Sequence, residues 1–159
     1  MRAEGPIQNM PQSLSFMLIH IVFSTKDRMP SIDAVIRPTL HAYLATIARS
    51  IECKCFRVGG VADHVHLAVQ LARTTTTAKL VEILKTSSAK WLKAQSPALT
   101  GFAWQRGYAV FSVRPTDLEA LRHYIDTQAA HHTTRTFEDE YRALLNKNDV
   151  SFDERYVWD

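Results

Sequence analysis

The sequence predicts an α+β fold in which helices pack on an antiparallel sheet, in the order strand, helix, strand, strand, helix, strand, helix. Three observations support this prediction. Apolar residues recur at helical spacing in residues 36–51 and 80–91, the segments around them have strand-like patterns, and Gly59 and Gly60 separate two strand segments as in a hairpin. The result is the βαββαβ order of the ferredoxin-like fold, with a further helix that carries Tyr124.

The composition is that of one globular domain. The chain has 159 residues, of which 46% are hydrophobic and 22% charged, and single domains commonly have about 100–200 residues. The net charge of +3 is compatible with a nucleic-acid partner. No apolar run reaches the about 18 residues of a membrane span, and residues 1–11 lack the apolar core of a signal peptide. Cys53 and Cys55 are too close for an unstrained disulfide, so reduced thiols in a cytosolic protein are expected.

The first half of the chain is expected to open with a flexible tail at residues 1–12 and a strand at residues 13–25. Both faces of this strand are largely apolar, which predicts a central position in the sheet. His20 within it is either a buried, hydrogen-bonded histidine or a neighbour of a metal site. A helix from about residue 31 to 52 follows, with Ser31 as N-cap and Pro38 in its first turn or at a kink. Strands at 53–58 and 62–71 then form the hairpin.

The next helix is expected to follow the polar residues 74–77 and to end near residue 94. Leu80, Leu84 and Trp91 line one side, and Lys79, Lys90 and Lys93 share another. These lysines form either a solvated face or contacts to phosphates. Residues 102–113 have the pattern of one or two strands, interrupted at Gly107. Their aromatic residues, either core or stacking surfaces for bases, are Phe102, Trp104, Tyr108 and Phe111.

Tyr124 lies on a helix that is predicted to start at a capping box of Thr116 and Glu119 and to end at residues 131–134. Tyr124 and Gln128 lie one turn apart at the edge of its apolar stripe, half sheltered and still reachable. The stripe consists of Leu118, Leu121, Ile125 and Ala129. An amphipathic helix at residues 137–145 follows, and the apolar residues 156–158 are expected to dock on the body or on a partner chain.

His64 and His66 form the pattern with the clearest chemical meaning. Alternate side chains of a strand share a face, so the two imidazoles point the same way while Val65 and Leu67 point towards a core. Such a pair can bind one divalent cation, and Gln128 offers a further oxygen ligand that suits Mg²⁺ or Mn²⁺. The alternative is a half-buried strand whose histidines make ordinary hydrogen bonds. Asp63 is expected to point to the opposite face.

Four separated motifs carry a family resemblance. They are GGVADHVHL at residues 59–67, WQRGY at 104–108, YIDTQ at 124–128 with the following His131 and His132, and DERYVWD at 153–159. In this order they resemble the single-tyrosine transposases of the IS200/IS605 type, including the relatives associated with repetitive extragenic palindromes. The resemblance extends from about residue 14 to residue 159.

The resemblance implies a reaction on single-stranded DNA beside hairpins. Tyr124 would attack a phosphodiester, form a covalent 5′-phosphotyrosine and release a 3′-hydroxyl, while His64, His66 and Gln128 hold Mg²⁺ or Mn²⁺. Because imidazole binds metal only when neutral, activity is expected to fall below about pH 6.

The resemblance also implies a homodimer in which the tyrosine helix can serve the partner's histidine pair, and a cytoplasmic protein associated with the nucleoid. Residues 13–134 would form the catalytic domain, and residues 135–159 a C-terminal helix and docking tail. By the same resemblance Lys85 lies close to DNA. Together with Lys85, the DNA-binding candidates are Lys79, Lys90, Lys93 and Arg106.

Two other functions remain compatible with the sequence. One is a non-catalytic module that binds single-stranded nucleic acid, because four-stranded sheets of this topology also bind single strands by stacking. The other is a hydrolase with Zn²⁺ on His64 and His66, although the sequence offers no evident acidic third ligand on the same face. His131 is expected to have a surface or hydrogen-bonded role.

Overall fold

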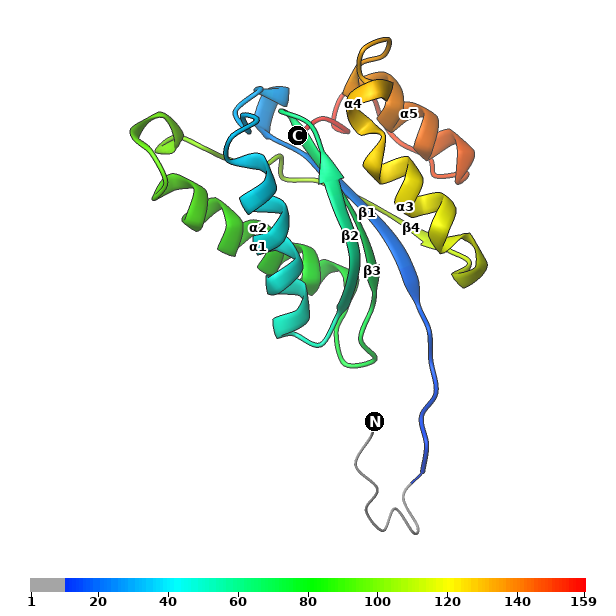
Figure 1. Cartoon of the computed structure of the whole chain (residues 1–159). Coiled ribbons are helices and arrows are strands. Elements are labelled where there is room, and N and C mark those ends of the chain that lie inside the picture. The colour runs from blue at the N-terminus through cyan, green and yellow to red at the C-terminus, as the bar shows by residue number, and fades with distance from the viewer. Residues whose placement is uncertain (1–10) are drawn as a thin grey trace.

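A computed structural model, which describes residues 11–159, contains a four-stranded antiparallel sheet (Figure 1). The strands lie in the order β2-β3-β1-β4. Their bounds are Leu18–Ser24 for β1, Lys54–Gly60 for β2, His64–Gln70 for β3 and Ala109–Val113 for β4. This arrangement confirms the predicted α+β fold of the βαββαβ type.

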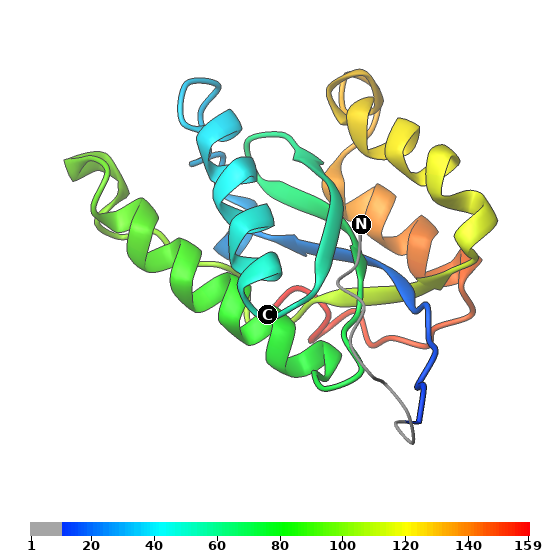
Figure 2. The same cartoon turned by 60° about the horizontal axis from the view of Figure 1, so that its bottom comes forward.

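Helices cover both faces of the sheet (Figure 1 and Figure 2). On one face lie α1 (Arg37–Ser50) and α2 (Thr77–Lys93), and on the other lie α3 (Leu118–Asp126), α4 (Gln128–His131) and α5 (Phe137–Lys147). Short 3₁₀ segments occur at Lys26–Arg28, Pro97–Leu99 and Pro115–Asp117. None of the helices within residues 11–159 combines the length and the apolar character that crossing a bilayer requires.

The central position of β1 agrees with its two apolar faces, since all seven of its residues are buried. Ile21 and Phe23 belong to the larger core under α1 and α2, whereas Val22 belongs to the smaller core under α5. The strand starts at Leu18 rather than at residue 13, because its pairing with β3 and β4 begins at Leu18. Residues 11–17 are exposed and irregular, and residues 1–10, most of the expected tail, lie outside the described part of the chain.

The start of α1 differs from the prediction. The helix begins at Arg37 with Pro38 in its first turn, a position where a missing N–H costs nothing. Ser31 is therefore not the N-cap. A turn precedes the helix, in which the Asp33 carboxylate accepts hydrogen bonds from the backbone N–H groups of the second and third residues that follow it.

The predicted faces of α2 are present in the structure. Thr76 caps the helix, because its Oγ1 accepts a hydrogen bond of 3.0 Å from the backbone N–H of Lys79. Leu80 and Leu84 are fully buried, and Trp91 is half-buried in a stack on Tyr43 of α1. The apolar side of α2 thus joins α1 to the sheet.

Gly59 and Gly60 do not form the hairpin turn as predicted, because they are the last residues of β2 and the turn comprises residues 61–63. Both glycines are required for close approach instead. A Cβ atom on Gly59 would lie 2.6 Å from Ile125 Cγ2 and 2.7 Å from the Ile125 carbonyl oxygen. Gly60 has a φ of +150°, and a Cβ there would lie 2.2 Å from the His64 carbonyl oxygen.

Residues 102–113 contribute less strand than predicted. β4 comprises only its last five residues, while Trp104 forms an isolated bridge with Thr25. Phe102, Trp104 and Phe111 are buried, and Tyr108 is exposed. The core interpretation therefore holds for the three buried aromatic side chains.

The helix that carries Tyr124 starts and continues differently from the prediction. Thr116 lies in a 3₁₀ turn and does not cap the helix, because the N-cap position is Asp117 and no side chain caps it. The helix is also divided, since Thr127 between α3 and α4 has non-helical angles (φ −100°, ψ 17°). The Tyr124 carbonyl accepts hydrogen bonds from the side chains of Thr127 and Gln128, which compete with regular helical bonding.

The C-terminal helix is present as predicted, and part of the tail docks on the body. Val157 and Trp158 pack on the small core under α5, with the Trp158 ring 5.7 Å from that of Tyr141. Trp158 also lies between the guanidinium groups of Arg28 and Arg142. Tyr156 is exposed.

Candidate metal and nucleophile site

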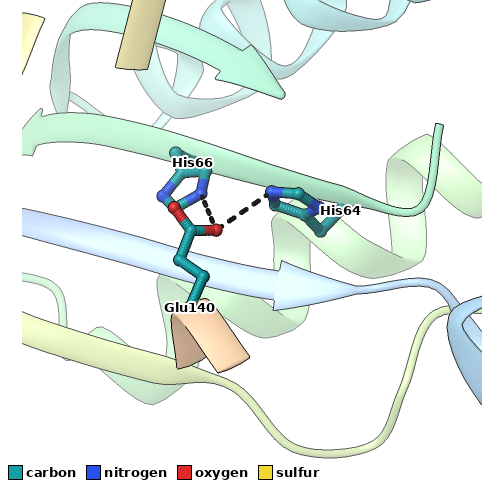
Figure 3. A group of neighbouring side chains, drawn as sticks. All are labelled: His64, His66 and Glu140. Carbon is teal, nitrogen blue, oxygen red and sulfur yellow. Dashed lines mark hydrogen bonds and ion pairs between the residues drawn. The ribbon is translucent and has the colours of Figure 1, made fainter. Parts of the chain in front are cut away.

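His64 and His66 are buried on the face of β3 that α5 covers. Val65 and Leu67 point into the core on the opposite side, as the alternation predicts. Figure 3 shows both imidazoles directed at the carboxylate of Glu140, whose side chain extends from α5 towards them. Glu140 Oε1 lies 3.3 Å from His64 Nε2 and 3.2 Å from His66 Nε2.

These three residues form a set of donors that can hold a metal ion. One ligand atom from each lies within 4.8 Å of the others, and all three side chains are buried. Two ligands at adjacent corners of an octahedron with bonds of about 2.1 Å are about 3.0 Å apart. The observed separations are close to this value, so an ion fits between the donors after small side-chain shifts.

Glu140 was not identified from the sequence, and the expectation that no acidic third ligand lies on this face is wrong. A signal for it exists in the pattern of residues 137–145. Phe137, Tyr141 and Leu145 face the core, and Glu140 lies on the same side of the helix, adjacent to Phe137. A carboxylate on an apolar stripe needs a partner when buried, which is the feature that distinguishes Glu140 from the exposed acids around it.

Gln128 and His132 extend the cluster from the end of the tyrosine helix. Gln128 is buried, and its Oε1 lies 2.9 Å from His64 Nε2, as expected for a candidate ligand. Its Nε2 donates a hydrogen bond of 3.0 Å to Glu140 Oε2. His132 Nε2 lies 3.0 Å from Glu140 Oε1 and 3.1 Å from Gln128 Oε1. His132 is thus part of the site, although the sequence indicated no role for it.

Tyr124 meets the same carboxylate from the other side. Its hydroxyl donates a hydrogen bond to Glu140 Oε2, and its ring centroid lies 5.6 Å from that of His66. The residues proposed as nucleophile, histidine pair and amide ligand therefore come together within one chain. His131 lies beside the Tyr124 ring and pairs with the Thr127 hydroxyl at 3.3 Å, in agreement with the expected hydrogen-bonded role.

Two further residues fix the orientation of the imidazoles. Asp63 Oδ1 lies 2.7 Å from His64 Nδ1, because Asp63 belongs to the turn and not to the strand. The expectation that it points to the opposite face is therefore wrong. His20 Nε2 lies 2.8 Å from His66 Nδ1, so His20 is both buried and hydrogen-bonded, and it borders the site. Such partners set which ring nitrogen is available to an ion.

The buried charges shift the pKa values of the cluster in different directions. Burial opposes a charge on His64, but its hydrogen bonds to Asp63, Glu140 and Gln128 outweigh burial and raise its pKa to about 9. Burial lowers the pKa of His66, and Glu140 only partly offsets this. The pKa of Glu140 is well below its usual range, because hydrogen bonds from the histidines and Tyr124 outweigh the effect of burial.

The Tyr124 hydroxyl is protonated in this arrangement. Burial, and then the hydrogen bond and negative charge of Glu140, raise its pKa well above the usual value of about 10. A carboxylate with a depressed pKa is a poor acceptor for such a proton. Tyr124 can therefore become a nucleophile only when Glu140 leaves it or when a nearby positive charge stabilises the phenolate.

The DNA-binding candidates are distributed over α2 and the loop before β4. Lys79, Lys90 and Lys93 on α2 and Arg106 in the loop are exposed. Lys85 differs from them, because its ammonium donates hydrogen bonds to the carbonyl groups of Gln105, Arg106 and Gly107, at 2.7, 3.2 and 2.6 Å. Lys85 thus holds this loop against α2.

Comparison with protein families gives a match to the family model described as "Transposase IS200 like", which covers residues 13–128. The chain belongs to this family. The matched segment contains the histidine pair, Tyr124 and Gln128 and ends before α5, so it does not include Glu140. A comparison with curated proteins finds no match.

Two solved structures share the fold of this IS200-like transposase. A Deinococcus radiodurans R1 protein assigned as a transposase superposes with a TM-score of 0.59 and 21% identity, over 76% of this chain and 97% of that one. A REP-associated tyrosine transposase bound to a REP hairpin gives a TM-score of 0.57 and 12% identity, over 79% of this chain and 73% of that one. At these identities the likeness concerns the fold alone.

Proposed function

We propose that this transposase cuts and rejoins single-stranded DNA beside hairpins through a covalent 5′-phosphotyrosine on Tyr124, with a divalent metal ion as cofactor. The observation that carries the proposal is the convergence of the Tyr124 hydroxyl and the histidine pair on the buried carboxylate of Glu140. Family membership supports the reaction class, and the hairpin bound by one structural relative supports the substrate.

His64, His66, Gln128 and Glu140 would hold the ion, and we propose Mg²⁺ or Mn²⁺ because oxygen ligands contribute half of this set. When bound, the ion would polarise a phosphate oxygen and offset the repulsion between phosphate and phenolate. Since His64 keeps a proton up to about pH 9 in the metal-free site, metal binding must displace that proton. Metal affinity should therefore continue to rise between pH 6 and pH 9. For an unperturbed imidazole, with a pKa of about 6.5, most of the rise would be complete at a lower pH.

In the reaction, the Tyr124 hydroxyl loses its proton and its oxygen forms a bond to phosphorus. The bond between phosphorus and the 3′-oxygen breaks, and that oxygen takes up a proton to become the free 3′-hydroxyl. Attack of a 3′-hydroxyl on the phosphotyrosine reverses these steps and returns Tyr124, so no nucleotide cofactor is consumed. Glu140 holds Tyr124 in its protonated form until substrate and metal are bound.

The decisive experiment measures the covalent adduct. The substrate is a pool of single-stranded oligonucleotides, each with a stable hairpin and randomised flanks, and the readout is a protein–DNA species that survives denaturing electrophoresis. We expect an adduct with Mg²⁺ or Mn²⁺ and none with EDTA. Tyr124→Phe should abolish the adduct without loss of binding, while Tyr156→Phe at an exposed tyrosine should have no effect. Cleavage by Tyr124→Phe at the wild-type rate would refute the mechanism.

A non-catalytic protein that binds single-stranded nucleic acid is a second candidate. The observation that favours it is the saturation of the site by Glu140, which already occupies the hydroxyl of Tyr124 and both imidazoles. This candidate predicts DNA binding that chelation does not change, and no adduct under any metal condition. The adduct experiment therefore separates the two candidates.

The metal itself needs a separate measurement, because two histidines and a glutamate are also a set of ligands found in catalytic zinc sites. Elemental analysis of protein purified without chelator should find Mg or Mn under the proposed function. One Zn per chain, retained through gel filtration, would instead support hydrolysis.

We further propose a homodimer, because joining two DNA ends needs two nucleophiles and the resemblance assigns one tyrosine to each chain. Sedimentation velocity with and without hairpin DNA would test this. Lys79, Lys90, Lys93 and Arg106 are proposed as DNA contacts on their exposure and charge.

A further inference from the structure

A groove of about 610 Å³ leads from Tyr124 to the surface between β4, α3 and α5. Its inner end is formed by Tyr124 and His20, and Phe111 and Leu144 contribute apolar surface along its sides. Polar groups line its outer part, namely Ser112, Arg114, Lys147 and Asn148. The volume lies within the range of about 300–1,000 Å³ that is usual for small-ligand pockets, which suits a short piece of single strand.

The groove carries a cation that forms no ion pair within the described part of the chain. Lys147 lies at the C-terminal end of α5, and its side chain forms no ion pair with any residue in the range 11–159. It is close enough to His20 for its charge to contribute to the lowered pKa of that buried imidazole, after burial itself and His66. Arg114 at the rim adds a second charge, which Asp117 shares at 3.1 Å.

A second groove reaches the site from the opposite side, but its charges are less suited to an anion. It has a volume of about 840 Å³ and is lined by Asp63, His132 and several arginines. Arg28 donates a hydrogen bond to the Trp158 carbonyl, and Arg37 donates two to the Ile32 carbonyl. Glu138 and Asp139 also line this groove, so acidic groups balance its arginines.

We propose that the groove between β4, α3 and α5 binds the nucleotides directly next to the phosphate that Tyr124 attacks, with the Lys147 ammonium on a backbone phosphate. Three features point to this ligand: the groove ends at the nucleophile, it carries an unpartnered cation at its outer part, and its walls combine apolar and polar groups. A nucleotide matches the last two features, because it presents a phosphate for the cation and a polar sugar and a flat base for the walls. The proposal rests on the proposed function and adds to it the path of the strand.

The first test measures the salt dependence of DNA binding without cleavage. Wild-type protein in EDTA is titrated against the hairpin oligonucleotides by fluorescence anisotropy at several NaCl concentrations. The logarithm of the binding constant falls as the logarithm of the salt concentration rises. Loss of one phosphate contact on a single strand makes this negative slope shallower by about 0.7. Lys147→Gln should show this loss. The matched control is Lys54→Gln, an exposed lysine on β2 at the other edge of the sheet, which should leave the slope unchanged.

The second test locates the DNA by protection. Ser112 is exposed within the groove, and both native cysteines are buried, so Ser112→Cys should provide a single reactive thiol. The hairpin oligonucleotides should slow maleimide labelling of this thiol at least fivefold. Ser50→Cys at the end of α1 is the matched control and should be labelled at the same rate with and without DNA.

The outcomes separate this inference from the proposed function. An unchanged salt slope in Lys147→Gln, together with unprotected Ser112→Cys, would overturn the groove even if the wild-type protein forms the adduct. A shallower slope and a protected thiol would support the groove even if no adduct is found with any metal. A third outcome would also count against the phosphate contact. It is that Lys147→Glu leaves both the protection of the Ser112→Cys thiol by DNA and the salt dependence of DNA binding unchanged.

Discussion

The Glu140 carboxylate contacts the histidine pair through one oxygen and Tyr124 and Gln128 through the other. At the scale of single residues, the Glu140 side chain can either form these hydrogen bonds and ion pairs or bind an ion. The carboxylate is buried, so it contributes a full negative charge in a place where water cannot screen it. Its removal should therefore affect both metal affinity and Tyr124.

Glu140→Gln should weaken Mn²⁺ binding at least tenfold, because the substitution removes a charged ligand and retains the shape of the side chain. Isothermal titration calorimetry at pH 8 measures the affinity. Glu138→Gln, two residues earlier in α5 and on the rim of the other groove, is the control and should bind Mn²⁺ as the wild type does. Equal affinity in both variants would show that Glu140 only covers the site.

His64 gives a second prediction at this scale, for the metal-free protein. Its folded-state pKa of about 9 lies above the unfolded value of about 6.5, so its protonation stabilises the fold fully below pH 6.5 and this contribution is lost as the pH rises through 9. At 1.36 kcal/mol per pKa unit the contribution is about 3 kcal/mol. The side chains of Asp63 and Glu140 face His64.

The measurement is urea unfolding in EDTA at pH 6 and pH 9.5, for the wild type and His64→Gln. The difference in unfolding free energy between the two proteins should shrink by about 3 kcal/mol on going to the higher pH. Comparison with His64→Gln removes the contributions of other titrating groups, which both proteins share. A difference that stays constant would mean that His64 is neutral in the folded protein.

At the scale of elements, the position of α3 depends on how closely it approaches β2. Gly59 permits this approach, because it has no side chain to displace Ile125. Ile125 is the residue after Tyr124, so the contact also sets the distance of Tyr124 from the sheet. Gly59 is also the register partner of His66, so this backbone contact beside the site controls the geometry of the site.

Gly59→Ala should destabilise the protein by about 1–3 kcal/mol, the usual cost of overpacking, and should reduce adduct formation more than DNA binding. Thermal unfolding and the adduct yield measure the two effects. Gly101→Ala is the control, since a Cβ at Gly101 meets no atom within 4 Å. Wild-type adduct yield in Gly59→Ala would show that α3 can shift without consequence for Tyr124.

At the scale of the whole molecule, the structure assembles Tyr124 with the histidine pair of its own chain. The resemblance allows the alternative, in which the tyrosine helix serves a partner. Such an exchange would require α3, which carries Tyr124, to leave its contacts with β2 and β3.

Mixing Tyr124→Phe with His64→Ala tests which arrangement is active. If each chain uses its own residues, neither variant has a complete site and the mixture should form no adduct. If the tyrosine helix crosses to the partner, one of the two sites in a mixed dimer is complete, and each mixed dimer should give up to about half of the adduct of a wild-type dimer. We expect no recovery. Each of the two variants alone serves as a control.

The fold and half of the site were predictable from local pattern. Strand alternation indicated the shared face of His64 and His66, and helical spacing indicated Tyr124 and Gln128. Glu140 is marked in the sequence only as a carboxylate on an apolar stripe. Its contact with the histidine pair, and that of His132, could not be predicted because they depend on how α5 packs across the sheet. The position of Asp63 was misjudged for a related reason, since the hairpin turn lies after the glycines and not at them.

The segment shared with the family ends at residue 128, but the folded unit does not. α5 covers Val22, Ala109 and Phe111 with Phe137 and Tyr141, and it delivers Glu140. A gene trimmed to residues 13–128 would encode a polypeptide with an uncovered apolar face, and Tyr124 would lack its acidic neighbour. Such a fragment should precipitate on expression, and any strand cleavage it retained would be a misleading guide to the intact protein.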